Sequence, residues 1–195
     1  MKSIIIILSL LILSCDYGHK KIGQNTVIPH KQEKEKLGTN TEEIKNNILL
    51  VNNTQRTFSN PNTKDIFSIK ITGPSLLKGQ MIFQITDSNG NVILKEEYPS
   101  NYLIGYEFDD DDPIEKKEEH IKKRVAEFFK DDNFFTPAIE KDLKYDEDYS
   151  DLKVWNDIKS DSTAIGFYYL IGAENGSKIA YSKKEKKVVM YFNCC

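Results

Sequence analysis

Apolar and polar residues alternate along two neighbouring segments of the chain, residues 67–72 and 81–85. An extended strand points successive side chains to opposite faces, so this alternation predicts two strands that are each buried on one face. Residues 87–91, Asp-Ser-Asn-Gly-Asn, favour a tight turn into a third strand at 92–97, because glycine and asparagine tolerate positive φ angles. The side chains assigned to the buried faces are Phe67, Ile69, Ile71, Met81, Phe83 and Ile85.

Helical periodicity interrupts this strand pattern twice. A first helix is expected to begin at Pro113, with Asp112 as its N-cap, and to end near residue 130. A second, shorter helix is expected at 151–159, where Leu152, Trp155 and Ile158 share one face. The apolar stripe of the first helix consists of Ile114, Ile121, Val125 and Phe128.

Further strands are expected on both sides of these helices. Alternation predicts a fourth strand at 102–108, and three closing strands at 164–171, 177–182 and 187–194. This order of elements predicts an α+β fold. Its mostly antiparallel sheet should have about seven strands, with a helical insert between strands four and five.

The first fifteen residues have the pattern of an export signal. Lys2 precedes an apolar run at residues 4–13, which is shorter than the ~20 residues of a membrane-spanning helix and fits a signal peptide. The run leads into Ile12-Leu13-Ser14-Cys15, with a small residue directly before the cysteine. This segment resembles the lipobox of bacterial lipoprotein precursors. The alternative is an ordinary signal peptide followed by an incidental cysteine.

The resemblance implies that residues 1–14 are a signal peptide and that Cys15 becomes the lipid-modified amino terminus. Several acyl chains, such as palmitate, on one residue exceed the two signals that stable membrane attachment requires. We therefore expect a lipoprotein of the bacterial cell envelope, anchored to a membrane, with the outer membrane favoured over the inner one. The resemblance ends at Cys15 and implies nothing about activity.

Residues 15–64 are poor in aromatic residues and rich in polar ones. Such a segment buries too little apolar surface to offset its ordering entropy, so we expect a lipid-anchored, flexible tether. Its last part is an uncertain lead-in, because residues 40–49 suit a short capped helix while residues 48–51 suit the start of a strand. We expect residues 65–195 to form a single α+β domain.

Charge divides unevenly between these two parts. Residues 15–64 carry eight basic and five acidic side chains, a net charge of +3, whereas residues 65–195 carry eighteen and twenty-five, a net charge of −7. Arg56 and Arg124 are the only arginines in the sequence. An acidic domain so poor in arginine is not expected to bind nucleic acid. Three histidines and three cysteines leave little with which to build a metal site, so we expect neither a metal nor a cofactor.

Two acidic clusters and one histidine are candidates for chemistry. Residues 109–112 are four consecutive aspartates, and residues 146–151 carry carboxylates at alternate positions, which suits the oxygen ligands that Ca²⁺ prefers. Helix capping and a solvated loop explain both clusters more simply, since consecutive side chains diverge and the glycine of an EF-hand loop is missing. His120 is expected on the helix surface. We therefore assign no catalytic residue.

The sequence ends in two adjacent cysteines, Cys194 and Cys195. If Cys15 is acylated, these are the remaining thiols, and an exported compartment favours their oxidation. The C-x-x-C spacing of redox enzymes is absent from the sequence. We expect a buried or disulfide-bonded structural pair, and a vicinal disulfide is the specific hypothesis.

Aromatic residues gather in the middle of the chain, around the expected helices. Most must fill the core. Phe134, Phe135, Tyr145 and Tyr149 fall in loop-like sequence among acidic residues, so they form a candidate binding surface for a basic protein or a glycan. The sequence thus favours a non-catalytic, membrane-anchored binding module. Two alternatives stay open: an inhibitor or immunity-type lipoprotein that neutralises a cationic envelope-directed enzyme, and a hydrolase that works with carboxylates alone.

Overall fold

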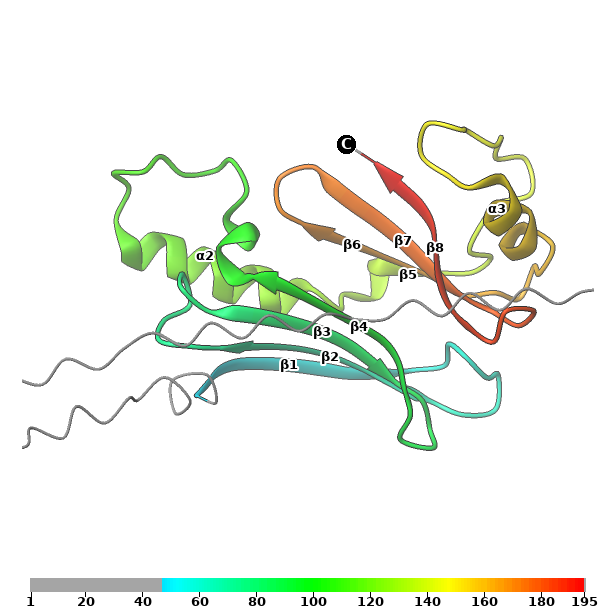
Figure 1. The fold of residues 1–195 in the computed structure, drawn as a ribbon, viewed down its shortest axis with the longest axis horizontal. Coiled ribbons are helices and arrows are strands. Elements are labelled where there is room, and N and C mark those ends of the chain that lie inside the picture. The colour runs from blue at the N-terminus through cyan, green and yellow to red at the C-terminus, as the bar shows by residue number, and fades with distance from the viewer. Residues whose placement is uncertain (1–46, 195) are drawn as a thin grey trace, which may run out of the picture. The chain divides into compact units, whose positions relative to one another are not determined.

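The computed structural model describes residues 47–194, which form an α+β fold with two antiparallel sheets of four strands each (Figure 1). The strand orders are β1-β2-β3-β4 and β5-β6-β7-β8, so each strand pairs with its neighbours in sequence. The α+β class and the antiparallel pairing are confirmed. The expected single sheet of about seven strands is wrong, because the chain leaves the first sheet after β4 and starts a second one.

The elements have the following bounds. The first sheet contains β1 (Ile48–Arg56), β2 (Asp65–Thr72), β3 (Gln80–Thr86) and β4 (Val92–Pro99). The second sheet contains β5 (Phe134–Phe135), β6 (Gly166–Ile171), β7 (Asn175–Ser182) and β8 (Lys187–Cys194). Between β4 and β5 lie the 3₁₀ turn η1 (Ser100–Ile104), helix α2 (Ile114–Glu127) and the 3₁₀ turn η2 (Asp131–Asn133), and helix α3 (Leu152–Lys159) lies between β5 and β6.

The strands predicted from alternation at 67–72 and 81–85 are β2 and β3. All six apolar side chains assigned to their buried faces are inaccessible to solvent. In the antiparallel register, Phe67 lies opposite Ile85 and Ile69 lies opposite Phe83. The predicted turn is closed by Asp87, whose carboxylate accepts hydrogen bonds from the backbone N–H groups of Asn89 and Asn91 at 2.8 Å each.

The strand β1 lies ahead of residue 65, inside the segment 15–64 that we expect to be tether and lead-in. It pairs with β2 along its length, and Phe58, which follows it, packs edge-on against the Phe67 ring at 5.1 Å. Pairing satisfies backbone groups that β2 would otherwise leave open at its edge. The strand interpretation of residues 48–51 is therefore confirmed, and the folded region includes residues before 65. The expected signal peptide and the first part of the tether lie outside the described residues.

Residues 102–108 do not form the expected fourth strand. The strand expected at 92–97 is β4, and β1 completes the four strands of the first sheet. The Ser100 hydroxyl donates to the Leu76 carbonyl oxygen at 2.5 Å and accepts from the Gly79 N–H at 3.0 Å, which turns the chain as β4 ends. Leu103 is then the buried residue, whereas Tyr106 is 81% exposed. The alternation in this segment therefore does not mark a sheet face.

Both predicted helices are present. Asp151 caps α3, because its carboxylate accepts a hydrogen bond from the Val154 N–H at 2.9 Å. The expected cap of α2 is wrong: the N-cap residue is Pro113, and the Asp112 carboxylate instead accepts from the Asp109 N–H at 2.9 Å, closing a turn within the aspartate cluster. Within residues 47–194, neither helix has the length and apolar character that crossing a membrane requires.

The main core lies where the inner faces of the two sheets and α2 meet (Figure 1). The Phe67 ring on β2 lies 5.3 Å from the Phe167 ring on β6, and Phe83 on β3 lies 5.1 Å from Tyr169 on β6. A carboxylate of β4 borders this core. Glu96 accepts a hydrogen bond from the Tyr169 hydroxyl at 2.8 Å, and burial together with this carboxylate raises the pKa of Tyr169, so the hydroxyl remains a donor.

A second, smaller core lies on the opposite face of the second sheet. Trp155 and Ile158 of α3 pack there against Ala180, Val189 and Tyr191 of β7 and β8. The second sheet is thus covered on both faces, although α3 spans only eight residues. The part of this face that α3 leaves uncovered carries the candidate site.

Replacing Phe67 with alanine should lower the free energy of unfolding by about 3–5 kcal/mol, because the substitution leaves a cavity between the sheets. The matched control is Ile66→Ala on the adjacent residue of β2, whose side chain is 42% exposed on the opposite face and should change stability by less than about 1 kcal/mol. Denaturant unfolding of both variants measures this difference. Equal losses would contradict the assignment of the core face.

Candidate functional site

A groove of about 280 Å³ opens where the segment 136–151 passes over the second sheet. We call it the loop groove, and the segment the acidic loop. Its lining combines aromatic rings with two lysines and one aspartate. The lining residues are Ala138, Leu143, Lys144, Asp146, Tyr149, Ser150, Trp155, Lys178, Tyr191 and Phe192.

Hydrogen bonds to β8 anchor the acidic loop at both ends. The Tyr191 hydroxyl donates to the Ala138 carbonyl oxygen at 2.6 Å, and the Ser150 hydroxyl donates to the Tyr191 carbonyl oxygen at 2.8 Å. The Asn193 N–H donates to the Tyr149 carbonyl oxygen at 2.9 Å. Burial raises the pKa of Tyr191, so its hydroxyl stays protonated and remains a donor. The loop is therefore held in place although most of its side chains are exposed.

A row of rings and one lysine crosses the outer face of the second sheet beside the groove. The Lys178 ammonium lies 4.9 Å from the centre of the Phe192 ring and 5.9 Å from that of Phe135, and Phe192 lies 5.7 Å from Tyr149. Gly166 permits this row, because a Cβ atom there would meet the Phe135 ring at 2.4 Å. The ring faces in this row already accept a cation.

The structure brings together some of the four aromatic residues predicted as a binding surface. Tyr149 lines the loop groove, and Tyr145 packs on Trp155 at 6.0 Å beside it. Phe135 lies at the other end of the row. Phe134 does not join them, because its ring packs into the main core, 4.6 Å from Phe167.

Of the four residues predicted as a binding surface, Tyr149 alone lines the groove, and the lining residues that sequence reasoning missed include Trp155, Lys178, Tyr191 and Phe192. They come from three different elements, so no local motif unites them. The alternation along β8 is also broken. Lys178 and Ile179, neighbours on β7, pair with Phe192 and Met190, so Tyr191 is an extra residue on β8. Strict alternation along the strand therefore gives the wrong face for part of it. The one sequence feature that could have indicated this site is the tryptophan on the apolar face of α3.

The acidic loop carries most of the charge around the groove. Residues 140–151 contain six acidic and two basic side chains, a net charge of −4. Tyr145 and Tyr149 are each 36% exposed among these carboxylates. Burial and the neighbouring Glu147 and Asp151 carboxylates raise the pKa of Tyr145. The groove rim is thus both aromatic and strongly negative.

His120 is not the surface histidine that the sequence predicts. Its side chain is only 12% exposed, and its Nδ1 atom lies 3.1 Å from a carboxylate oxygen of Glu107. The Phe108 ring packs edge-on against it at 5.3 Å. The segment between η1 and α2 therefore folds back over the helix. Within residues 47–194, no group of three His, Cys, Asp or Glu side chains is placed to hold a metal ion.

A second depression, between the end of α3 and the β7–β8 turn, is lined by two aspartates. Both carboxylates are engaged, since Asp157 accepts from the Ser182 hydroxyl at 2.5 Å and Asp161 pairs with Lys183 at 2.7 Å. Burial alone would raise the pKa of Asp161, but hydrogen bonds from Lys183 and Thr163 hold it below its usual value. A carboxylate hydrolase needs two carboxyl groups available to its substrate, whereas both aspartates of this depression already bond to neighbouring side chains.

The predicted cysteine pair lies only partly within the described residues. Cys194, the last residue of β8, is disulfide-bonded. Cys195 and the predicted lipidation site Cys15 lie outside the described residues. The vicinal disulfide therefore stays a prediction.

The fold and the loop groove together define a two-sheet α+β domain with an acidic, aromatic groove on its second sheet. Comparisons of the chain with protein-family models, with curated proteins and with solved structures find no match. The chemistry of the groove is therefore what bears on function.

Replacing Ser150 with alanine should loosen the acidic loop, because the Tyr191 carbonyl oxygen loses its hydroxyl donor. We expect a loss of about 1 kcal/mol in unfolding free energy and faster hydrogen exchange of amides in 140–151. Ser162→Ala, at an exposed position after α3, is the control and should change neither. Unchanged exchange in the Ser150 variant would show that the loop is held by other contacts.

Proposed function

We propose that the protein is a non-catalytic binding module of the bacterial cell envelope, tethered by lipid, that captures a basic segment of a protein partner at the loop groove. One observation carries the proposal: an exposed, acidic and aromatic loop is anchored by hydrogen bonds over a groove lined with ring faces. A preorganised surface binds with a smaller entropic penalty than a floppy one.

Charge complementarity favours a basic partner. The acidic loop's net charge of −4 lies within residues 140–151, whereas residues 65–195 as a whole carry −7. Such a local field attracts cationic surfaces and speeds their encounter, and added salt weakens it. Binding should therefore be strongest at low ionic strength.

The rings of the groove provide a specific contact for lysine or arginine side chains. Two of the protein's own lysines already lie over such rings: Lys178 over Phe192 at 4.9 Å, and Lys159 over Trp155 at 5.9 Å. A partner cation between Tyr149 and Asp146 would combine a ring face with a carboxylate. Aromatic anchors of this kind carry much of the energy at protein interfaces.

Neutralising the acidic loop should weaken its binding of basic proteins. We compare the triple variant Asp146→Asn, Glu147→Gln, Asp148→Asn with a matched variant of the other acidic cluster, Asp109→Asn, Asp110→Asn, Asp111→Asn. Both change the net charge by the same amount. Proteins of envelope extracts are captured at low salt and identified, and each is then purified and titrated against the chain from residue 16 onward. We expect roughly tenfold weaker binding for the loop variant alone.

Equal losses of affinity in the two triple variants would contradict binding at the loop groove, because the net charge of the protein would then explain binding wherever the charges lie. If the chain instead binds a neutral glycan, and added salt does not weaken that complex, the proposal of a basic partner is wrong and the glycan is the ligand. A fragment for such work must include β1, since a chain starting at residue 60 would remove the strand that covers the edge of β2.

The inhibitor or immunity-type alternative is a special case of this proposal. Its partner would be a cationic envelope-directed enzyme, and binding at the loop groove would block that enzyme's own substrate site. Loss of the captured enzyme's activity on addition of this protein distinguishes it from simple capture. The carboxylate hydrolase receives no comparable support, because the two aspartates of the depression beside α3 are already engaged by Ser182 and Lys183.

The lipid anchor is tested separately. Replacing Cys15 with serine should move the protein from the membrane fraction to the soluble fraction, because serine cannot carry the thioether-linked lipid that the lipobox resemblance implies. Cell fractionation followed by immunoblotting measures the change, and Cys194→Ser is the matched control that should stay with membranes. Continued sedimentation of the Cys15 variant with membranes would contradict the lipoprotein assignment.

A further inference from the structure

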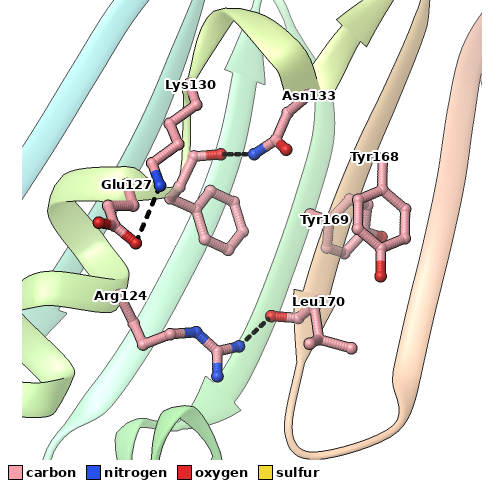
Figure 2. Close-up of a pocket in the computed structure, with 8 residues that line it drawn as sticks. Arg124, Glu127, Lys130, Asn133, Tyr168, Tyr169 and Leu170 are labelled. Carbon is pink, nitrogen blue, oxygen red and sulfur yellow. Dashed lines mark hydrogen bonds and ion pairs between the residues drawn. The ribbon is translucent and has the colours of Figure 1, made fainter.

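Another pocket lies between the end of α2 and the strand β6 (Figure 2). It is separate from the loop groove and from the depression at the end of α3. Its volume is about 180 Å³. The walls come from α2, from the turn that follows it and from one edge of the second sheet. The lining residues are Arg124, Glu127, Phe128, Lys130, Asn133, Tyr168, Tyr169 and Leu170.

Arg124 is the distinctive feature of this pocket. Figure 2 shows its guanidinium reaching from α2 to the Leu170 carbonyl oxygen, to which it donates at 2.9 Å, and it donates to the Leu103 carbonyl oxygen at 3.4 Å. Two carbonyl oxygens leave part of its five N–H groups for another acceptor. The other arginine, Arg56, is paired directly with the Asp131 carboxylate.

No carboxylate within residues 47–194 forms a salt bridge with Arg124. Glu107 and Glu127 attract it only from a greater distance, and burial lowers the pKa of Arg124 below its ordinary value. A partly buried cation that is bonded only to neutral oxygens is incompletely compensated. An anion that entered the pocket would complete its pairing.

The pocket exists because β5 is short. This strand pairs with β6 at only two positions, Phe134 with Phe167 and Phe135 with Gly166. The turn η2, which precedes β5, is not paired with the sheet, so residues 168–170 of β6 border the pocket instead of a strand. Phe128 adds an apolar wall to this space.

We propose that this pocket binds a small organic carboxylate with an apolar body, the carboxylate paired with Arg124 and the apolar part against the Phe128 ring. The charged side chains around the pocket favour a ligand that carries one negative charge. Lys130 is already paired with Glu127 at 3.1 Å, so Arg124 is the one uncommitted cation among the lining residues. The Glu127 carboxylate would repel an ion of higher charge, such as phosphate.

The test is an NMR titration of the isotope-labelled chain from residue 16 onward with 3-phenylpropanoate. Saturable shifts are expected for amides of residues 124–133 and 168–170. The neutral amide 3-phenylpropanamide, which has the same body without the charge, should bind roughly tenfold or more weakly. Inorganic phosphate should not compete. Absence of saturable shifts, equal binding of the amide or stronger binding of phosphate would overturn the proposal.

Two variants locate the charge. Arg124→Gln should lose the preference for the acid over the amide. The Arg124 change also removes bonds to two carbonyl oxygens and could therefore disturb folding. The second variant, Glu127→Gln, avoids this problem. It removes a repelling carboxylate and frees Lys130, so it should tighten 3-phenylpropanoate binding severalfold. The matched control is Glu119→Gln, on the same helix and likewise paired with a lysine three residues on, Lys122 at 3.3 Å. Equal tightening in both glutamate variants would overturn the assignment to this pocket.

Discussion

The packing of one apolar face of each sheet against the other supports the rest of the structure. Phe67 meets Phe167, and Phe83 meets Tyr169, through ring contacts between β2, β3 and β6. A four-stranded sheet with one apolar face is not stable until that face is covered. Because the inner faces cover one another together with α2, the outer face of the second sheet is left for α3 and the loop groove. The core thus decides where a binding surface can form.

Much of the fold could be predicted from the sequence, because β2, β3 and both helices depend on local periodicity that the folded core preserves. The division into two sheets could not be predicted, since it depends on where pairing stops. The decisive events are non-local: β1 pairs with β2, and the Ser100 hydroxyl turns the chain by bonding to Leu76. The segment 102–108 alternates as a strand would, yet its hydrogen bonds and Gly105, at φ 65°, direct it into a turn.

The candidate site was less predictable than the fold. Tyr145 and Tyr149 were identifiable as exposed rings in an acidic segment, but the same composition also selected Phe134, which belongs to the main core. Loop-like sequence has no period that separates inward from outward side chains. Trp155 and Phe192 reach the loop groove from different elements, and the irregular register of β8 hides the face on which its residues lie. The pocket beside Arg124 likewise depends on β5 being only two residues long, and no sequence motif predicts that length.

Native-state hydrogen exchange tests the central claim, that the two sheets form one cooperative unit through their shared core. If they do, the most protected amides of β2 and β3 and those of β6 and β7 will open with the same free energy, equal to that of global unfolding. They will also respond equally to added denaturant. Exchange of one sheet at a clearly lower free energy, while the other stays protected, would contradict the claim, because the protected sheet would then be stable without its partner.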